Sequence, residues 1–151
     1  MRNDSRLSRM LHVLIHMHQQ GDAMTSELLA KMLNTNAVVV RRTMAGLRDK
    51  AYVQSEKGHR GGWRLIVKLE DISLLDVYKS LGEPPIFALG LANDQPQCLV
   101  EQAVNAGLTD ALYEAKTLLM TRLAQVTVAQ LAQDFEQRAL TKGIDFSAIL
   151  H

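Results

Sequence analysis

Residues 25–66 contain two short amphipathic segments separated by the polar tripeptide Asn-Thr-Asn, followed by two runs of strand-forming residues joined by a glycine-rich loop. Thr25 and Asn36 precede the apolar residues of the two segments, the position at which such side chains cap helices. The β-branched run 38–40 favours a strand, but the cap and the apolar spacing over 37–49 favour a helix more strongly. The order predicted is therefore helix, short turn, helix and β-hairpin.

Periodic segments flank this central region on both sides. Residues 5–20 form a predicted amphipathic helix, and 73–82 form another that starts with a capping-box pattern at Ser73. A long helix is predicted to begin near residue 99 or 109 and to end at 125, and a last one begins at Thr127. The three prolines lie between these helices and indicate an irregular connector.

The net charge of +1 conceals two halves of opposite sign. Residues 1–68 carry twelve Lys and Arg against five Asp and Glu, a net charge of +7. Residues 69–151 carry five bases against eleven acids, a net charge of −6. The basic half indicates a polyanionic partner, and the acidic half indicates a different role.

The predicted order of elements is that of a winged helix-turn-helix. In such folds the third helix enters the DNA major groove and the hairpin, or wing, touches the backbone or minor groove. Arginine suits the O6 and N7 acceptors of guanine, valine methyls suit the thymine methyl, and a base near the helix end suits phosphate. The segment 37–49 therefore offers five candidate DNA contacts: Val38, Val39, Arg41, Arg42 and Arg48.

The glycine-rich loop admits three interpretations. It lacks both phosphate-loop patterns of nucleotide-binding enzymes, and it holds more glycine and more basic residues than a plain turn needs. As a wing tip its composition is understandable, because glycine allows close approach to DNA and basic side chains meet phosphates. We predict DNA contacts at Lys57, Gly58, His59 and Arg60, and we expect Trp63 to pack at the base of the wing.

Enzymatic and metal-binding functions find little support. No nucleophile–base arrangement and no pair of carboxylates suited to acid–base chemistry stands out. His12 and His16 have a spacing that can hold a metal, but no Cys or carboxylate nearby in sequence completes a site, so a structural role is favoured. Cys98 is the single cysteine. Together with the absence of a long apolar run and of a signal-peptide cleavage site, it suggests a cytoplasmic protein without a membrane partner.

Several stretches resemble a known family in their order and spacing. They are GLRDKAYV at the end of the third helix, KGHRGGWRL in the wing, ISLLDVYKSL after the wing, and the tail LTDALYEAKTLLMTRLAQVTVAQLA. Over nearly its whole length the chain resembles the Rrf2 family of bacterial winged-helix transcription regulators. The fold implied is mainly α with a small β-hairpin, a winged helix-turn-helix plus a long C-terminal dimerisation helix.

The resemblance implies a homodimer that binds a roughly palindromic double-stranded DNA operator, and we expect a repressor. It adds Asn36 to the predicted DNA contacts. The expected organisation is a DNA-binding domain at 1–82, a connector and sensing loop at 83–107, and a dimerisation helix with a closing helix at 108–151.

The connector departs from the pattern of the members that bind an iron–sulfur cluster. Those members carry three cysteines there, whereas this chain has only Cys98, and a cluster needs more thiolate ligands. We therefore expect no cluster and no other cofactor. The signal is left open between a small molecule, sought in a pocket between connector and long helix, and oxidation of Cys98 to a disulfide between protomers.

An alternative function belongs to another class. A winged helix can serve as a protein-interaction module without touching DNA. Such a module has little need of a net charge of +7 in its first 68 residues, so the charge distribution favours DNA binding.

Overall fold

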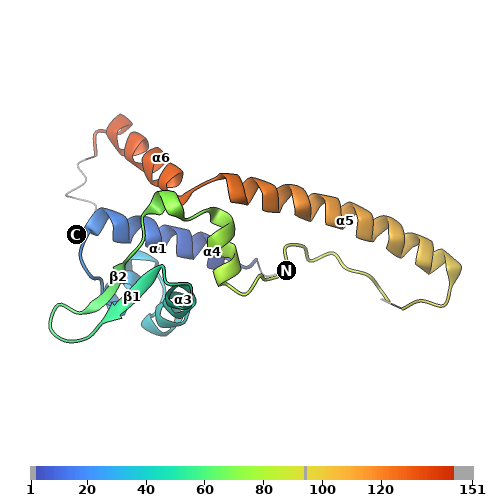
Figure 1. Cartoon of the computed structure of the whole chain (residues 1–151), viewed down its shortest axis with the longest axis horizontal. Coiled ribbons are helices and arrows are strands. Elements are labelled where there is room, and N and C mark those ends of the chain that lie inside the picture. Colours follow the sequence, from blue (N-terminus) through green and yellow to red (C-terminus); the bar gives the residue numbers. More distant parts are fainter. Residues whose placement is uncertain (1–2, 94, 145–151) are drawn as a thin grey trace.

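The computed structural model describes residues 3–93 and 95–144 and is mainly α-helical with one antiparallel hairpin (Figure 1). The fold class predicted from the sequence is confirmed. The elements in chain order are α1 (Arg6–Gln20), α2 (Ser26–Met32), α3 (Ala37–Asp49), β1 (Val53–Glu56), β2 (Gly62–Leu65), the 3-10 turn η1 (Leu69–Asp71), α4 (Leu74–Ser80), α5 (Leu99–Gln125) and α6 (Val128–Thr141).

Local capping interactions place the helix starts where the sequence predicts them. The Thr25 hydroxyl accepts a hydrogen bond from the Leu28 N–H at 3.1 Å, and the Asn36 side chain accepts one from Val39 N–H at 3.0 Å. Helices α4 and α6 each begin with a complete capping box. Gly21 ends α1 with a φ of 76°, a conformation that glycine adopts without strain.

The β-branched run at the start of α3 is helical because one of its members belongs to the core. Val40 is 1% exposed and lies on the same face as Met44 and Leu47, which are fully buried. Burial of this face favours the helix by more than the small intrinsic preference of valine for strands opposes it. The same rotation leaves Val38 61% exposed on the outer face.

A single core joins α1 to the helix-turn-helix, the hairpin, α4 and α6. Its members come from both ends of the chain, because Val128 and Ala132 of α6 pack with residues of the first half. The largest fully buried side chains are Met10, Leu14, Met24, Leu29, Met44, Leu47 and Ile72.

The hairpin is anchored to the segment before α2 by a connection that the sequence patterns did not reveal. Met24 N–H donates to Trp63 C=O at 2.9 Å, and Trp63 N–H donates to Met24 C=O at 2.8 Å. The indole Nε1–H of Trp63 donates to the buried hydroxyl of Ser26 at 3.0 Å. Trp63 is only 8% exposed, so it packs at the base of the wing as expected.

Helix α5 projects from this body as a long arm (Figure 1), and none of its 27 residues is buried. Helix α6 turns back onto α1 and η1. A backbone bridge holds this return, since Val128 N–H donates to Ile72 C=O and Leu74 N–H donates to Val126 C=O, both at 2.9 Å. Among the described residues, no helix is long and apolar enough to cross a membrane.

Candidate nucleic-acid interface

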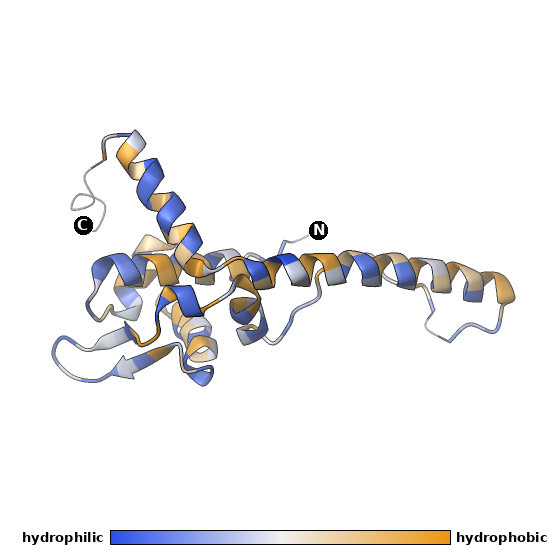
Figure 2. Cartoon of the chain, turned by 45° about the horizontal axis from the view of Figure 1, so that its top comes forward, coloured by the Kyte–Doolittle hydropathy of each residue, from blue (hydrophilic) through white to orange (hydrophobic). Residues whose placement is uncertain are grey.

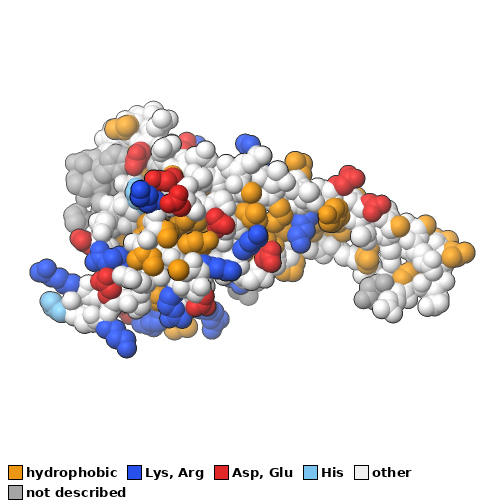
Figure 3. Space-filling model, viewed as in Figure 1, with side chains coloured by type: hydrophobic (Ala, Val, Ile, Leu, Met, Phe, Trp, Pro, Cys, Tyr) orange, Lys and Arg blue, Asp and Glu red, His pale blue; other side chains and the backbone are white. Residues whose placement is uncertain are grey.

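Helix α3 and the hairpin lie on the same side of the molecule, and Lys and Arg side chains gather over them (Figure 3). The exposed face of α3 carries Val38, Arg41, Arg42 and Arg48. All four tip residues of the hairpin, from Lys57 to Arg60, are exposed. These predicted residues of α3 and the hairpin therefore lie exposed on the same side of the molecule.

Arg41 is held by an acidic partner from the preceding helix. Its Nη2 donates to Oε1 of Glu27 at 2.7 Å, and both side chains are more than half exposed. Glu27 lies in the first turn of α2, where a carboxylate is favoured by the helix dipole. The two residues line a hollow between α2, α3 and the hairpin, together with Gly58 and Gly61.

Arg42 points into a different hollow, although it follows Arg41 directly in the sequence. One residue of helix corresponds to a rotation of about 100°, which directs Arg42 towards the start of α1. That hollow has a volume of about 630 Å³ and is also lined by Arg6, Arg9 and Val39. We call it the basic hollow, and its arginines suit the binding of phosphate.

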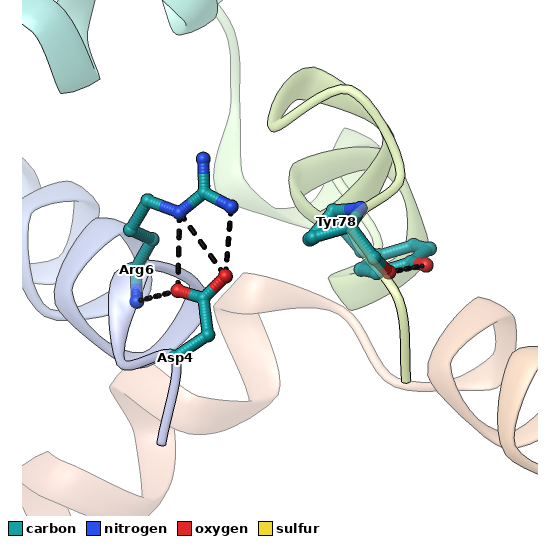
Figure 4. Close-up of polar contacts among 4 residues, drawn as sticks. Asp4, Arg6 and Tyr78 are labelled. Atoms are coloured by element: carbon teal, nitrogen blue, oxygen red, sulfur yellow. Dashed lines mark hydrogen bonds and ion pairs between the residues drawn. The ribbon is translucent and has the colours of Figure 1, made fainter. Parts of the chain in front are cut away.

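Arg6 of the basic hollow is partly neutralised. Its Nε and Nη2 donate to the Asp4 carboxylate at 3.0 and 2.7 Å, as Figure 4 shows. The Arg6 side chain and backbone N–H hold the pKa of Asp4 at about 2, below its usual value, so the pair stays ionised near neutrality. Arg9 and Arg42 form no ion pair within the described part of the chain, and they supply the net positive charge of this hollow.

Asn36 and Arg48 occupy the two ends of α3. The Asn36 side-chain oxygen is engaged as the helix cap, which leaves only its NH₂ group free to donate to DNA. Arg48 is 53% exposed and lies 3.7 Å from the carboxylate of its neighbour Asp49, a long and weak ion pair. Both residues therefore lie on the predicted surface, with Asn36 carrying a structural role as well.

Glycine is favoured at the three glycine positions of the wing for different physical reasons. A Cβ on Gly61 would lie 2.4 Å from the carbonyl oxygen of Glu56, and one on Gly62 would lie 2.5 Å from that of Met24. These two glycines are therefore required by the packing of the hairpin itself. Gly58 has a φ of 97° and open space around it, so its backbone conformation and not its packing favours glycine, and its contact with DNA stays a prediction.

Cys98 lies apart from this surface. It is the N-cap of α5, which begins at the end of the molecule away from the hairpin (Figure 1). The thiol is exposed, and the first-turn backbone N–H groups of Glu101 and then Val100 lower its pKa. A larger fraction of Cys98 is therefore thiolate at a given pH than for an ordinary cysteine.

An apolar hollow of about 490 Å³ lies where the chain leaves α4. It is lined by the start of α1, by Tyr78 and Leu81, and by residues 84–88, and the Tyr78 hydroxyl donates to the Pro84 carbonyl (Figure 4). No residue of α5 lines it. This hollow therefore differs from the pocket between connector and long helix that the sequence analysis proposes.

Three charged residues of the two hollows were missed by the sequence analysis: Arg6, Arg9 and Glu27. Arg6 and Arg9 precede the helix-turn-helix by more than fifteen residues, so their proximity to Arg42 is a tertiary effect. Glu27 precedes Arg41 by 14 residues, and no local sequence pattern specifies this pairing.

The family model for Rrf2, described as iron-dependent transcriptional regulator, matches residues 3–134. The chain is 31% identical over 122 residues to YwnA of Bacillus subtilis (strain 168), provisionally named an HTH-type transcriptional regulator; the match covers 80% of this chain and 90% of YwnA. A crystal structure of a candidate transcriptional regulator from Lactobacillus plantarum superposes with a TM-score of 0.76 at 23% identity, covering 89% of this chain and 92% of the other.

A further crystal structure, of a candidate DNA-binding protein, is 28% identical with a TM-score of 0.65, covering 84% of this chain and 98% of the other. The iron of the family description does not fit a cysteine-ligated cluster here. One chain supplies a single thiolate, and the described residues contain no group of three or more His, Cys, Asp and Glu that could hold a metal.

The family match, the relative and the winged-helix geometry agree with one another. The match spans most of the chain, and its members are regulators of transcription and not enzymes. The chain belongs to the Rrf2 family of transcriptional regulators.

Proposed function

We propose that the protein is a homodimeric repressor that binds a specific double-stranded DNA operator. Helix α3 enters the major groove, and the tip of the hairpin contacts the backbone or minor groove. The observation that carries this proposal is the shared surface of α3 and the hairpin, on which arginines flank the exposed methyl groups of Val38. Arginine with apolar methyl groups is the chemistry of base reading in the major groove.

Phosphate contacts come from the two sides of α3. Lys57, His59 and Arg60 at the wing tip reach one side, and the basic hollow with Arg9 and Arg42 reaches the other. Several such contacts release counterions, so the affinity for DNA falls steeply as the salt concentration rises. Positions 1–82 serve this binding, which is the organisation expected from the sequence.

The homodimer rests on the uncovered apolar face of α5. Val104, Leu108 and Leu118 are 53%, 45% and 72% exposed, and Figure 2 shows hydrophobic residues along the whole arm. A helix that projects with such a face into water gains its stability by packing against another helix. A second copy of α5 supplies a matching face, and the resulting two-fold symmetry matches a palindromic operator.

Signal reception is proposed for residues 83–107, which include Cys98 and one side of the apolar hollow, residues 84–88. A small apolar ligand would act in the hollow where the chain leaves α4, and an oxidant would act at Cys98, at the start of α5. A change at either place would alter the distance between the two winged helices of a dimer. This arrangement would couple the signal to operator binding without a cofactor.

Selection of bound duplexes from a randomised DNA pool tests the central proposal. A palindromic consensus and a salt dependence equivalent to several phosphate contacts are expected. Replacement of Arg42 by alanine should weaken binding to all duplexes. Failure to enrich any sequence, or an affinity independent of salt, would favour the protein-interaction alternative.

Sedimentation equilibrium tests the dimer. Leu118→Asp places a charge on the apolar face of α5 and should shift the protein towards a monomer. Thr117→Asp is the matched control, because the neighbouring position lies about 100° around the helix and away from this face. Equal association in the two variants would exclude the apolar face as the dimer interface.

A further inference from the structure

Among the described residues, the Glu27–Arg41 ion pair is the one that joins a base-reading candidate of α3 to an acid from another helix. The Nη2–Oε1 distance is 2.7 Å, and the exposed fractions of the Arg41 and Glu27 side chains are 55% and 64%. Exposed ion pairs contribute little to stability. Stability therefore gives a weak reason for this contact, and its position on the DNA-facing surface suggests a role in recognition.

A carboxylate on a DNA-binding face works against affinity. Glu27 lies beside the wing, whose tip carries Lys57, His59 and Arg60, and phosphates drawn to that region would be repelled by it. Such a charge lowers the binding of every duplex alike. The carboxylate can nevertheless raise the discrimination between operator and unrelated DNA, because specificity is a difference between affinities.

The geometry shows how that gain arises. Arg41 uses only its Nη2 in the pair, so its Nε and Nη1 donors stay available. The contact holds the guanidinium on the side of α3 that faces α2 and the hairpin. Arg42, in contrast, has no acidic partner within the described part of the chain and opens onto the basic hollow.

We propose that Glu27 is a positioning residue that keeps Arg41 off the phosphates and directs its free N–H groups to a base edge. Arg41 then reads sequence while Arg42 supplies general affinity. Glu27 thus lowers non-specific binding and raises discrimination at one base pair of each half-site. This inference rests on the proposed DNA-binding function and deepens it.

The test compares Glu27→Gln with Asp49→Asn. Both variants remove one negative charge from an exposed carboxylate of the helix-turn-helix region that pairs with an arginine, but only the first affects Arg41. Each variant, Arg41→Ala and the double variant Glu27→Gln/Arg41→Ala are assayed by selection from a randomised duplex pool. Non-specific affinity is measured on a duplex of unrelated sequence over a salt series.

Arg41→Ala should relax the base preference at one position of the half-site. At the same position, Glu27→Gln should lower the ratio of the affinities for the preferred and the other base pairs by about fivefold or more. The double variant should show no further loss at that position. Both charge-removing variants should raise non-specific affinity, whereas Asp49→Asn should keep the wild-type base preference. A structural role alone would not move the preference at a single base pair.

Three results would overturn the inference. They are an unchanged base preference in Glu27→Gln, relaxation at a position different from that of Arg41→Ala, and an equal effect of Asp49→Asn. Binding by the wild-type protein distinguishes these failures from failure of the proposed function. If the wild type enriches no sequence, both proposals fall, whereas enrichment with any of the three results removes only the role of Glu27.

Discussion

The wing contains two glycines that provide a matched test of how the hairpin is held. Gly62 and Gly58 both have positive φ, at 139° and 97°. A Cβ added to Gly62 would lie 2.5 Å from the carbonyl oxygen of Met24, whereas one added to Gly58 would meet nothing within 4 Å. Replacement of either glycine by alanine therefore strains the backbone, but only Gly62→Ala also forces the hairpin away from its neighbour.

The difference between the variants follows from the bonds that would break. Backbone strain costs about 1–3 kcal/mol in both variants. Gly62→Ala also separates Trp63 from Met24, which are joined by backbone hydrogen bonds of 2.9 and 2.8 Å. At about 0.5–1.5 kcal/mol for each bond, Gly62→Ala should be less stable than Gly58→Ala by about 1–3 kcal/mol.

Urea unfolding followed by circular dichroism, at one fixed protein concentration, measures this difference. Trp63 is the only tryptophan of the chain, so its fluorescence reports the hairpin separately. Its emission should move to longer wavelength in folded Gly62→Ala and stay unchanged in Gly58→Ala. Equal unfolding free energies for the two variants, or wild-type emission from Gly62→Ala, would refute the reasoning.

Three further predictions concern groups outside the wing tip. Ser26→Ala leaves the buried indole N–H of Trp63 without its acceptor and should lower the unfolding free energy by about 1–3 kcal/mol; urea midpoints equal to those of the wild type would contradict this. Cys98 should react with iodoacetamide at a lower pH than free cysteine, because its pKa is lowered; a rate profile matching free cysteine would remove the effect of the helix start. Burial, and then the neighbouring histidine, lowers the pKa of His16. As the pH falls, the His16 imidazole is therefore protonated in the unfolded chain before it is protonated in the folded chain. The contribution of His16 to the free energy of unfolding is complete above about pH 6.5 and is lost as the pH falls through the lower pKa of the folded state. Melting temperatures should drop more steeply on acidification in the wild type than in His16→Gln, and parallel curves would exclude this.

Much of the fold could be predicted because its signals are local. A cap such as Thr25 or Asn36 acts on N–H groups two or three residues away, and helical apolar spacing needs no knowledge of the partner surface. The conflict at Val38–Val40 was also resolved correctly, since the buried face of α3 is visible in the spacing of its apolar residues. The assignment of individual DNA contacts stays a prediction.

The sequence alone is enough to predict the order of helices, the hairpin, the basic and acidic halves and the family. The tertiary structure decided what neighbouring residues do. Arg41 and Arg42 are equivalent in sequence, but successive residues of a helix face different neighbours, so one meets Glu27 and the other joins Arg9. Likewise, only packing shows that Gly62 is required by Met24, that α6 returns to the core, and that none of the residues of α5 is buried. These outcomes depend on contacts between segments distant in the chain, which no local pattern encodes.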